Sequence, residues 1–275
     1  MAKRRKRAEI ASMIIGWLLS IVVLVPFSLI VINSFKTSRD AVLMQLTWPR
    51  DGFILDNYIE ILGGDFIFRS FFNSLLISTS CVILCVMVSA MASFVIKRRR
   101  TRFHSVVFYL FFAGLIAPMN YVTTLHVLRV FNMNGTFQGL ILTYVAMGIP
   151  FASFLYYNFM STFPCEIDEA SIIDGANTLN LFSRVIFPLL TPITITVGTL
   201  TFISSWNDFI SPLFLLNRST RWGMILMVYN YWGFLNQEWG MISAIIVLTL
   251  LPILALYVAM QKYIIAGMTQ GAIKG

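Results

Sequence analysis

The side chain whose type and setting most suggest chemistry is Asp208, which lies in a long apolar stretch directly after Trp206 and Asn207. A carboxylate at membrane depth is costly unless it faces water or a partner, so its position marks a candidate functional site. Hydrogen-bonding side chains next to an aromatic face can bind a polar solute, which makes these three residues candidates for a substrate path. The alternative is that Asp208 only satisfies backbone groups near Pro212. The sequence leaves both readings open.

The other reactive side chains form no catalytic or metal-binding pattern. His104 and His126 have no second His, Cys or carboxylate at ligand spacing. Cys81 and Cys85 lie inside an apolar run, where free cysteine behaves as a small hydrophobic residue. The sequence also lacks a GxxxxGK[ST] phosphate-binding loop. We therefore expect a protein that is not an enzyme and that binds no metal or cofactor itself.

Composition places these residues in a membrane protein. Hydrophobic residues make up 58% of the 275 and charged residues only 12%, with a mean hydropathy of +0.80. The charged share is about half that of a soluble domain, which excludes an ordinary soluble fold. The net charge of +8 comes from short basic clusters beside apolar runs. Such clusters suit cytoplasmic loops that face anionic lipid, and they do not suit a nucleic-acid surface.

The elements that must position these side chains are apolar helices. About 20 apolar residues are needed to span the hydrocarbon core, and each span must be helical because lipid offers no hydrogen-bond partners. Six stretches meet this test: residues 13–32, 71–96, 103–128, 137–160, 189–216 and 241–263. We predict an all-α, polytopic bundle of six transmembrane helices in a single domain over residues 1–275. Pro118 and Asn120 make the second half of the third span polar and predict a kink there.

Basic residues in the connections predict the orientation of the bundle. Residues 3–7 read KRRKR before the first span, and five Lys and Arg side chains lie within residues 97–102 between the second and third. Lys and Arg stay on the cytoplasmic side, so both termini are expected there. We therefore predict a multi-pass membrane protein with cytoplasmic N- and C-termini.

The cytoplasmic connection from residue 161 to 188 differs from the others because it is long and not basic. Four acidic residues, Glu166, Asp168, Glu169 and Asp174, face only Arg184. Pro164 suits a first helical turn, the acids suit a helix N-terminus, and Gly175 is placed as a stop.

The apolar residues of this connection are spaced as in a pair of amphipathic helices. One face carries Ile167, Ala170 and Ile173, and a second apolar patch carries Phe182, Val185 and Ile186. Exposed apolar patches on a membrane protein mark a docking site for a protein or for the lipid surface.

At this segment the sequence resembles the EAA loop of permease subunits of ATP-binding cassette importers. The stretch reads EASIIDGANTLNLFSRVIFPLLTP, with Ser171 in place of the usual second alanine. The matching positions include Glu169, Ala170, Ser171, Asp174, Gly175, Ala176, Phe182 and Pro188. The loop is a strong signal because so many positions match at fixed spacing.

Further segments are similar to carbohydrate permeases of this family. They are NSFK (residues 33–36), NYIEIL (57–62), FFNSLL (71–76) and SWNDFISPL (205–213). Residues 261–275, which include the predicted cytoplasmic tail over residues 264–275, are similar to the tail of the maltose-type second permease subunit, with Gly267, Gly271, Lys274 and Gly275 in register. The glycines also predict that residues 267–275 add no stable helical turn.

The resemblance implies a partnership that the residues alone do not show. Two permease subunits form the translocation path, two ATPase subunits bind ATP and Mg beneath them, and an extracytoplasmic binding protein delivers the sugar. In this arrangement the EAA helices fit a groove on each ATPase subunit, and the tail reaches the ATPase interface. The resemblance also implies that the chain itself hydrolyses nothing and that it lies in a bacterial or archaeal cell membrane.

Two alternatives remain. The first is an importer permease of the same family for another solute, such as glycerol phosphate or a polyamine. An anionic solute would favour cationic residues in the spans, and the spans hold almost none. A stand-alone secondary transporter is expected to show internal repeats and several deep ionisable residues, and only Asp208 approaches that description.

Overall fold

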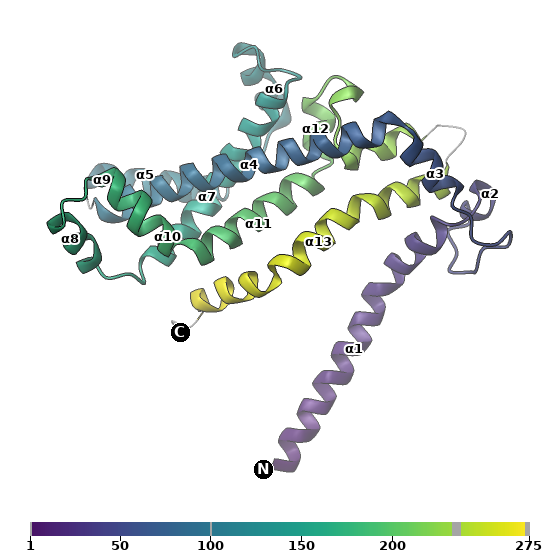
Figure 1. Ribbon diagram of the computed structural model, residues 1–275, viewed down its shortest axis with the longest axis horizontal. Coiled ribbons are helices and arrows are strands. Elements are labelled where there is room, and N and C mark those ends of the chain that lie inside the picture. Colours follow the sequence, from purple (N-terminus) through teal and green to yellow (C-terminus); the bar gives the residue numbers. More distant parts are fainter. Residues whose placement is uncertain (1, 100, 233–237, 273–275) are drawn as a thin grey trace. The chain divides into compact units, whose positions relative to one another are not determined.

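The computed structural model describes residues 2–99, 101–232 and 238–272, and its regular elements in these ranges are helices (Figure 1). The long helices are α1 (Ala2–Asn33), α4 (Asp65–Arg98), α7 (Phe137–Met160) and α13 (Trp239–Ala272). The shorter ones are α2 (Ser38–Ala41), α3 (Asp56–Gly63), α5 (Arg102–Gly114), α6 (Tyr121–Val130), α8 (Glu166–Ile173), α9 (Thr178–Asn180), η1 (Leu181–Ile186), α10 (Phe187–Leu189), α11 (Thr191–Asn207), α12 (Ile210–Leu215), η2 (Ser219–Arg221) and η3 (Met224–Asn230). The all-α fold is therefore confirmed.

Four of the described helices are long and apolar enough to cross a membrane. They are Ser12–Asn33, Asp65–Arg98, Phe137–Met160 and Trp239–Gln261, which agree with the first, second, fourth and sixth predicted spans. A fifth span is added if Thr178–Leu189 and Thr191–Asn207, which meet at a bend of 78°, count as one.

The third predicted span, residues 103–128, is two helices instead of one. Helix α5 ends at Gly114 and α6 begins at Tyr121, with Pro118 in the connection between them. Proline cannot donate a helical hydrogen bond. The side chain of Asn120 then starts α6 by accepting a hydrogen bond from the Thr123 N–H at 3.1 Å. The predicted kink is thus a complete break.

Two other boundaries differ from prediction. The fifth stretch, residues 189–216, is interrupted because α11 ends at Asn207 and α12 begins at Ile210. Residues 267–275 were predicted to add no stable helical turn, and this is wrong for the described residues 267–272, because α13 continues to Ala272. Each glycine costs a helix about 1 kcal/mol relative to alanine, but extending an existing helix avoids the cost of nucleation. Lys274 and Gly275 lie outside the described residues.

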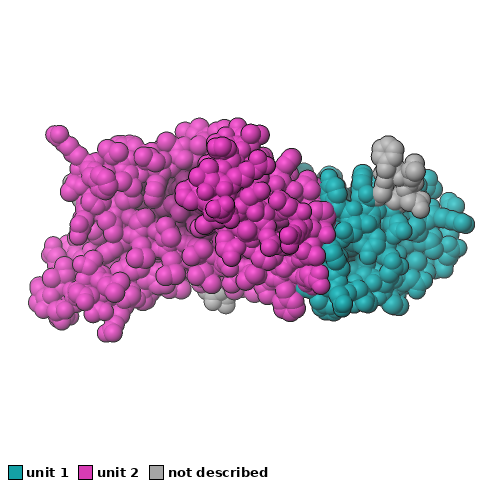
Figure 2. Space-filling view, turned by 90° about the horizontal axis from the view of Figure 1, so that it is seen from above, with its two compact units in different colours: residues 1–68, 227–251 teal, residues 69–226, 252–275 magenta. Residues whose placement is uncertain are grey.

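Contacts between Cα atoms divide the chain into two compact units, coloured separately in Figure 2. Unit 1 holds residues 1–68 and 227–251, and unit 2 holds residues 69–226 and 252–275. The single domain stays a prediction.

Unit 1 is centred on buried polar side chains. Asn33, Ser34, Lys36 and Asn57 are all buried. The Lys36 ammonium donates to the carbonyl oxygen of Gln45 at 2.8 Å. The start of α13 approaches the same place, because a Cβ atom at Gly240 would lie 2.8 Å from the Lys36 carbonyl oxygen. Only glycine fits there.

Unit 2 has an apolar core that joins α4, α7, η1 and α11. It includes Phe94, Tyr156, Leu181, Ile186 and Ile193, all buried. Helix α5 also packs closely on α7, because a Cβ at Gly114 would lie 2.9 Å from Pro150 Cγ. This close contact agrees with the packing role of small residues in membrane helices.

Candidate functional sites

The segment over residues 161–188 folds as the helix series α8, α9, η1 and α10, at the end of unit 2 where α4 ends (Figure 1). Helix α8 begins at Glu166, two residues after Pro164, so the expectation that Pro164 lies in the first turn is wrong. The reason is that Cys165 supplies the first helical acceptor: its carbonyl oxygen receives the N–H groups of Asp168 and Glu169 at 3.0 and 3.2 Å. Glu166, Asp168 and Glu169 form the acidic first turn, as predicted.

Gly175 ends α8 in the manner its position predicted. Its φ of +85° is left-handed, a conformation that glycine adopts at little cost. The Ala176 N–H donates to the Ser171 carbonyl oxygen and the Gly175 N–H donates to that of Ile172, both at 3.0 Å. These two bonds are the Schellman pattern of a helix C-terminus. A Cβ atom at Gly175 would meet nothing within 4 Å, so the backbone at this turn is open to approach.

Helix α8 presents an exposed surface that is both apolar and acidic. Ile173 is 84% exposed and Ile172 is 59% exposed, and Glu169, Ala170 and Asp174 are exposed beside them. Ile167, which we expected on the same face, is half-buried. Ser171 donates to the Ile167 carbonyl oxygen at 2.8 Å, so its hydroxyl is satisfied within the helix.

The second patch predicted for this segment is not an exposed surface. Ile186 is 1% exposed, and Phe182 packs its ring 5.4 Å from that of Phe94 on α4. These side chains face inward because the apolar end of α4 lies beneath them. Ala176 packs partly buried against the same core, while Pro188 in α10 is exposed. Of the EAA-like residues, Phe182 and Ala176 therefore hold the segment in place.

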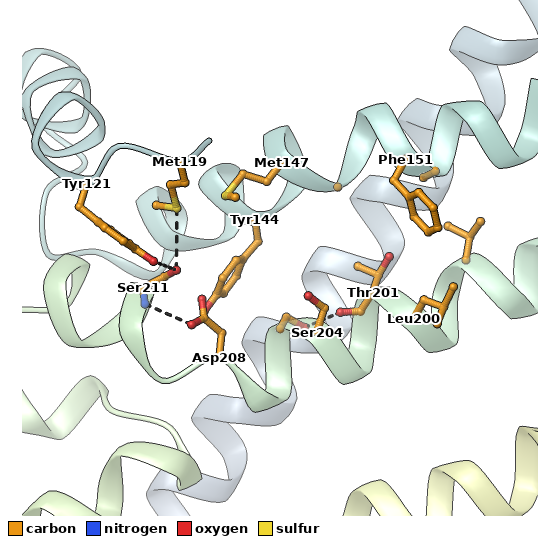
Figure 3. A pocket seen from close by; sticks show the side chains of 14 residues that line it. Met119, Tyr121, Tyr144, Met147, Phe151, Leu200, Thr201, Ser204, Asp208 and Ser211 are labelled. Atoms are coloured by element: carbon orange, nitrogen blue, oxygen red, sulfur yellow. Dashed lines mark hydrogen bonds between the residues drawn. The ribbon is translucent and has the colours of Figure 1, made fainter. Parts of the chain in front are cut away.

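A second candidate site is a cavity of about 490 Å³ among α7, α11, α12 and the start of α6 (Figure 3). Its lining includes Met119, Tyr121, Tyr144, Ser204, Asp208 and Ser211. Among the described lining residues, Asp208 is the single charged side chain. Of the three residues predicted for a substrate path, only Asp208 lines it.

The other two predicted path residues lie elsewhere. Trp206 is 2% exposed, stacked on Phe202 at 5.4 Å and edge-on to Phe71 at 6.0 Å. Its ring therefore offers no exposed face to a sugar in this structure. Asn207 is exposed but is not among the cavity's lining residues.

The carboxylate of Asp208 starts α12. Its Oδ1 accepts hydrogen bonds from the N–H groups of Ile210 at 3.0 Å and Ser211 at 3.3 Å. Asp208 therefore does satisfy neighbouring backbone groups, and whether it also has a role in a substrate path stays open. The same carboxyl group lies beside the ring of Tyr144 in the lining of the cavity (Figure 3). One side chain can hold the turn and still present an oxygen to the cavity.

Sequence reasoning missed the two tyrosines of this cavity. The Tyr121 hydroxyl lies 3.4 Å from that of Ser211, and Tyr144 comes from α7. Each ring joins an apolar face to a polar hydroxyl, a combination suited to sugars. The signal available in the sequence was a tyrosine within an apolar span, where the hydroxyl needs a partner.

No metal site is found within the part of the chain that the structure describes, where no three His, Cys, Asp or Glu side chains cluster. His104 Nδ1 lies 2.6 Å from the Thr101 hydroxyl. Cys81 and Cys85 are free and buried, as expected for small hydrophobic residues.

Comparison with known proteins decides the family. Residues 70–270 match the family model of the binding-protein-dependent transport system inner membrane component. The chain belongs to this family. It is accordingly a multi-pass membrane protein and a permease subunit of a transport system, not a catalytic enzyme.

Relatives of this permease match over nearly their whole length. The diacetylchitobiose uptake system permease protein NgcG of Streptomyces coelicolor is 30% identical, and the match covers 98% of this chain and 90% of that protein. The multiple sugar-binding transport system permease protein MsmG of Streptococcus mutans is 31% identical, with 92% and 93% covered.

Solved structures confirm the fold of the permease. A chain in the crystal structure of a bacterial ABC transporter involved in import of the acidic polysaccharide alginate superposes with a TM-score of 0.80. The two are 20% identical, and the match covers 93% of this chain and 96% of that one. At this identity the likeness shows the permease fold alone.

Proposed function

We propose that this permease forms half of the translocation path of an ATP-driven importer for a sugar or oligosaccharide. In this proposal the chain has six spans, with α5 and α6 counted as one and α11 with the helices around it as another. An even number of spans puts both termini on one side, and the basic clusters at residues 3–7 and 97–102 favour the cytoplasm as that side. A second permease subunit completes the path, two ATPase subunits bind ATP and Mg, and an extracytoplasmic binding protein delivers the substrate. The printed names of the relatives, which concern diacetylchitobiose and multiple sugars, support this substrate class.

The observation that carries the coupling role is the exposed end of α8. Ile172 and Ile173 are among the chain's exposed large apolar side chains, and the open turn at Gly175 follows directly. An apolar patch with acidic neighbours fits a groove on another protein better than it fits anionic lipid. We assign this patch to the ATPase subunit, with Glu169 and Asp174 as its charged contacts.

The cavity at Asp208 is the candidate substrate path on this chain. The described residues that line it include no Lys or Arg, which disfavours an anionic solute such as glycerol phosphate. Its tyrosine rings and hydroxyl groups favour a neutral sugar.

Co-purification tests the assembly. A tagged chain extracted from native membranes is expected to bring a second permease and an ATPase with a phosphate-binding loop. Membranes of the same cells should take up at least one of labelled maltotriose, raffinose and diacetylchitobiose. A functional monomer with no ATPase partner would overturn the proposal.

Two substitutions test the docking surface itself. Gly175→Asp and Glu169→Lys are expected to leave membrane levels normal and to abolish coupled uptake. Glu166→Lys is the matched control, because Glu166 is exposed in the same helix and precedes the patch. Normal uptake by both test variants would remove the coupling assignment.

Deletion of residues 269–275 tests the tail. If the tail contacts the ATPase subunits, the shortened chain should insert normally and support a lower coupled ATPase rate. An unchanged rate would assign the tail no role in coupling.

A further inference from the structure

The last turn of α4 and the first turn of α8 are joined by one paired contact. Arg98 Nη2 donates to Asp168 Oδ1 at 3.0 Å, and Arg98 Nε lies 2.6 Å from Asp168 Oδ2. One N–H group of the guanidinium thus donates to the carboxylate, and Nε lies close to the second oxygen without donating a hydrogen bond to it. A hydrogen bond between two charged groups is stronger than one between neutral groups, and it constrains direction as well as distance. Arg98 Nη1 also donates to the Cys165 sulfur at 3.3 Å.

This ion pair is shielded from water. The side chains of Arg98 and Asp168 are 15% and 13% exposed, whereas the chain's other described ion pair, Arg50 with Asp40, has an arginine that is 75% exposed. Exposed pairs contribute little because solvent and salt screen them. A shielded pair is screened less, and removal of one partner leaves a charge without compensation.

Helix α8 has few other attachments. None of its residues is buried, while the following η1 contributes Leu181 and Ile186 to the core of unit 2. Ile167, Asp168 and Ser171 are its half-buried residues. The ion pair is therefore the directional link between α8 and α4.

Helix α4 can carry a displacement away from this link. Lys97, beside Arg98, fastens the same end to α7: its ammonium donates to the Ser161 hydroxyl at 2.7 Å and lies 4.5 Å from the centre of the Tyr157 ring. Near the other end of α4, Asn73 donates to the carbonyl oxygens of Thr220 and Trp222 at 3.1 and 3.0 Å. A continuous helix thus joins α8 to the loop before η3.

We propose that the Arg98–Asp168 pair is the tie through which movement of α8 displaces α4 during transport. This inference rests on the proposed coupling of α8 to an ATPase subunit. Arg98 and Asp168 are positioning residues: neither contacts substrate or nucleotide, and each acts through the helix that carries it. Breaking the pair should leave binding of the ATPase subunits intact and let α8 move without α4.

The alternative is that each charge stabilises only the end of its own helix. A basic residue near a helix C-terminus and an acidic residue near an N-terminus are both favoured by the helix dipole. The charge exchange Arg98→Asp with Asp168→Arg separates the two readings. The exchange restores the ion pair but places both charges unfavourably with respect to the helix dipoles. Coupling of transport to ATP hydrolysis should therefore recover if the pair links the two helices, and it should fall further if each charge acts only on its own helix.

The test uses the complete importer, with binding protein, in liposomes. Phosphate release and uptake of the sugar that the wild type imports give the sugar moved per ATP hydrolysed. Asp168→Asn and Arg98→Gln are expected to lower this ratio about fivefold to tenfold, the lower range of coupling between linked sites. The charge exchange should recover at least half of the loss.

Matched controls remove equal charge from the same turns. Arg99→Gln and Glu166→Gln alter exposed residues beside the pair and should keep the wild-type ratio. A wild-type ratio in Asp168→Asn, or a charge exchange that is worse than both single variants, would overturn the tie. A wild-type chain that recruits no ATPase would instead refute the proposed function, so the two failures are distinguishable.

Discussion

The side-chain amide of Asn57 donates a hydrogen bond of 2.9 Å to the main-chain carbonyl oxygen of Lys36, across 21 residues of sequence. The same nitrogen donates to the carbonyl oxygen of Ser34, also at 2.9 Å. Hydrogen bonds therefore connect two segments that look like separate family signatures, NSFK (residues 33–36) and NYIEIL (residues 57–62). Their polar side chains satisfy buried backbone groups, which explains why apolar residues would not serve there.

Asn57→Leu should destabilise unit 1. The substitution leaves two buried carbonyl oxygens without donors, at a cost of about 1–3 kcal/mol each in the free energy of unfolding. The midpoint of thermal unfolding in detergent measures this loss. Glu60→Gln, on the exposed side of the same helix, is the control and should change stability by less than about 0.5 kcal/mol. An unchanged midpoint in Asn57→Leu would contradict the pairing.

Tyr58 should make the stability of unit 1 depend on alkaline pH. Burial raises the pKa of Tyr58 above its ordinary value of 10.0, and the hydrogen bond with Ser34 at 2.7 Å opposes this shift. Because the pKa is higher in the folded state, the stabilisation is complete below the unfolded value and is lost as pH rises through the folded value. Unfolding midpoints from pH 9 to 11 should fall less in Tyr58→Phe than in the wild type. Parallel curves would show that Tyr58 contributes nothing to the fall.

Two substitutions at Asp208 separate its structural role from a role in transport. Asparagine retains an oxygen that can accept from the N–H groups of Ile210 and Ser211, so Asp208→Asn should keep wild-type stability. Asp208→Ala should lose about 1 kcal/mol of stability. If the carboxylate contacts the sugar, uptake falls in both variants. Normal uptake by Asp208→Asn would restrict Asp208 to starting α12.

Gly175 should tolerate asparagine better than valine. A φ of +85° is strained for a residue with a Cβ, by about 1–2 kcal/mol, and asparagine enters this region more readily than a branched residue does. Hydrogen exchange of the Gly175 and Ala176 amides, which bond to Ile172 and Ser171, reports whether the turn survives. Exchange should accelerate in Gly175→Val and change little in Gly175→Asn. Equal protection in both variants would show that the turn does not depend on glycine.

Local patterns in the sequence predicted the class and much of the framework. Apolar runs predicted α1, α4, α7 and α13 because span length depends only on consecutive residues. An interruption near Pro118 and the stop at Gly175 were also predictable, since each depends on one residue's backbone freedom, although only a kink was predicted at Pro118. The persistence of α13 past Gly267 was not predicted, because propensity scales omit the support of an existing helix.

What the sequence determined by itself is that this chain is a membrane permease with a helical, non-basic segment around Glu169 and Gly175. Only the tertiary structure decided which faces of that segment are exposed, that Phe182 packs inward, and that Trp206 is buried while Asp208 lines a cavity. It also paired Arg98 with Asp168, 70 residues apart. These outcomes depend on contacts between residues distant in the chain, and local periodicity carries no information about which of them meet.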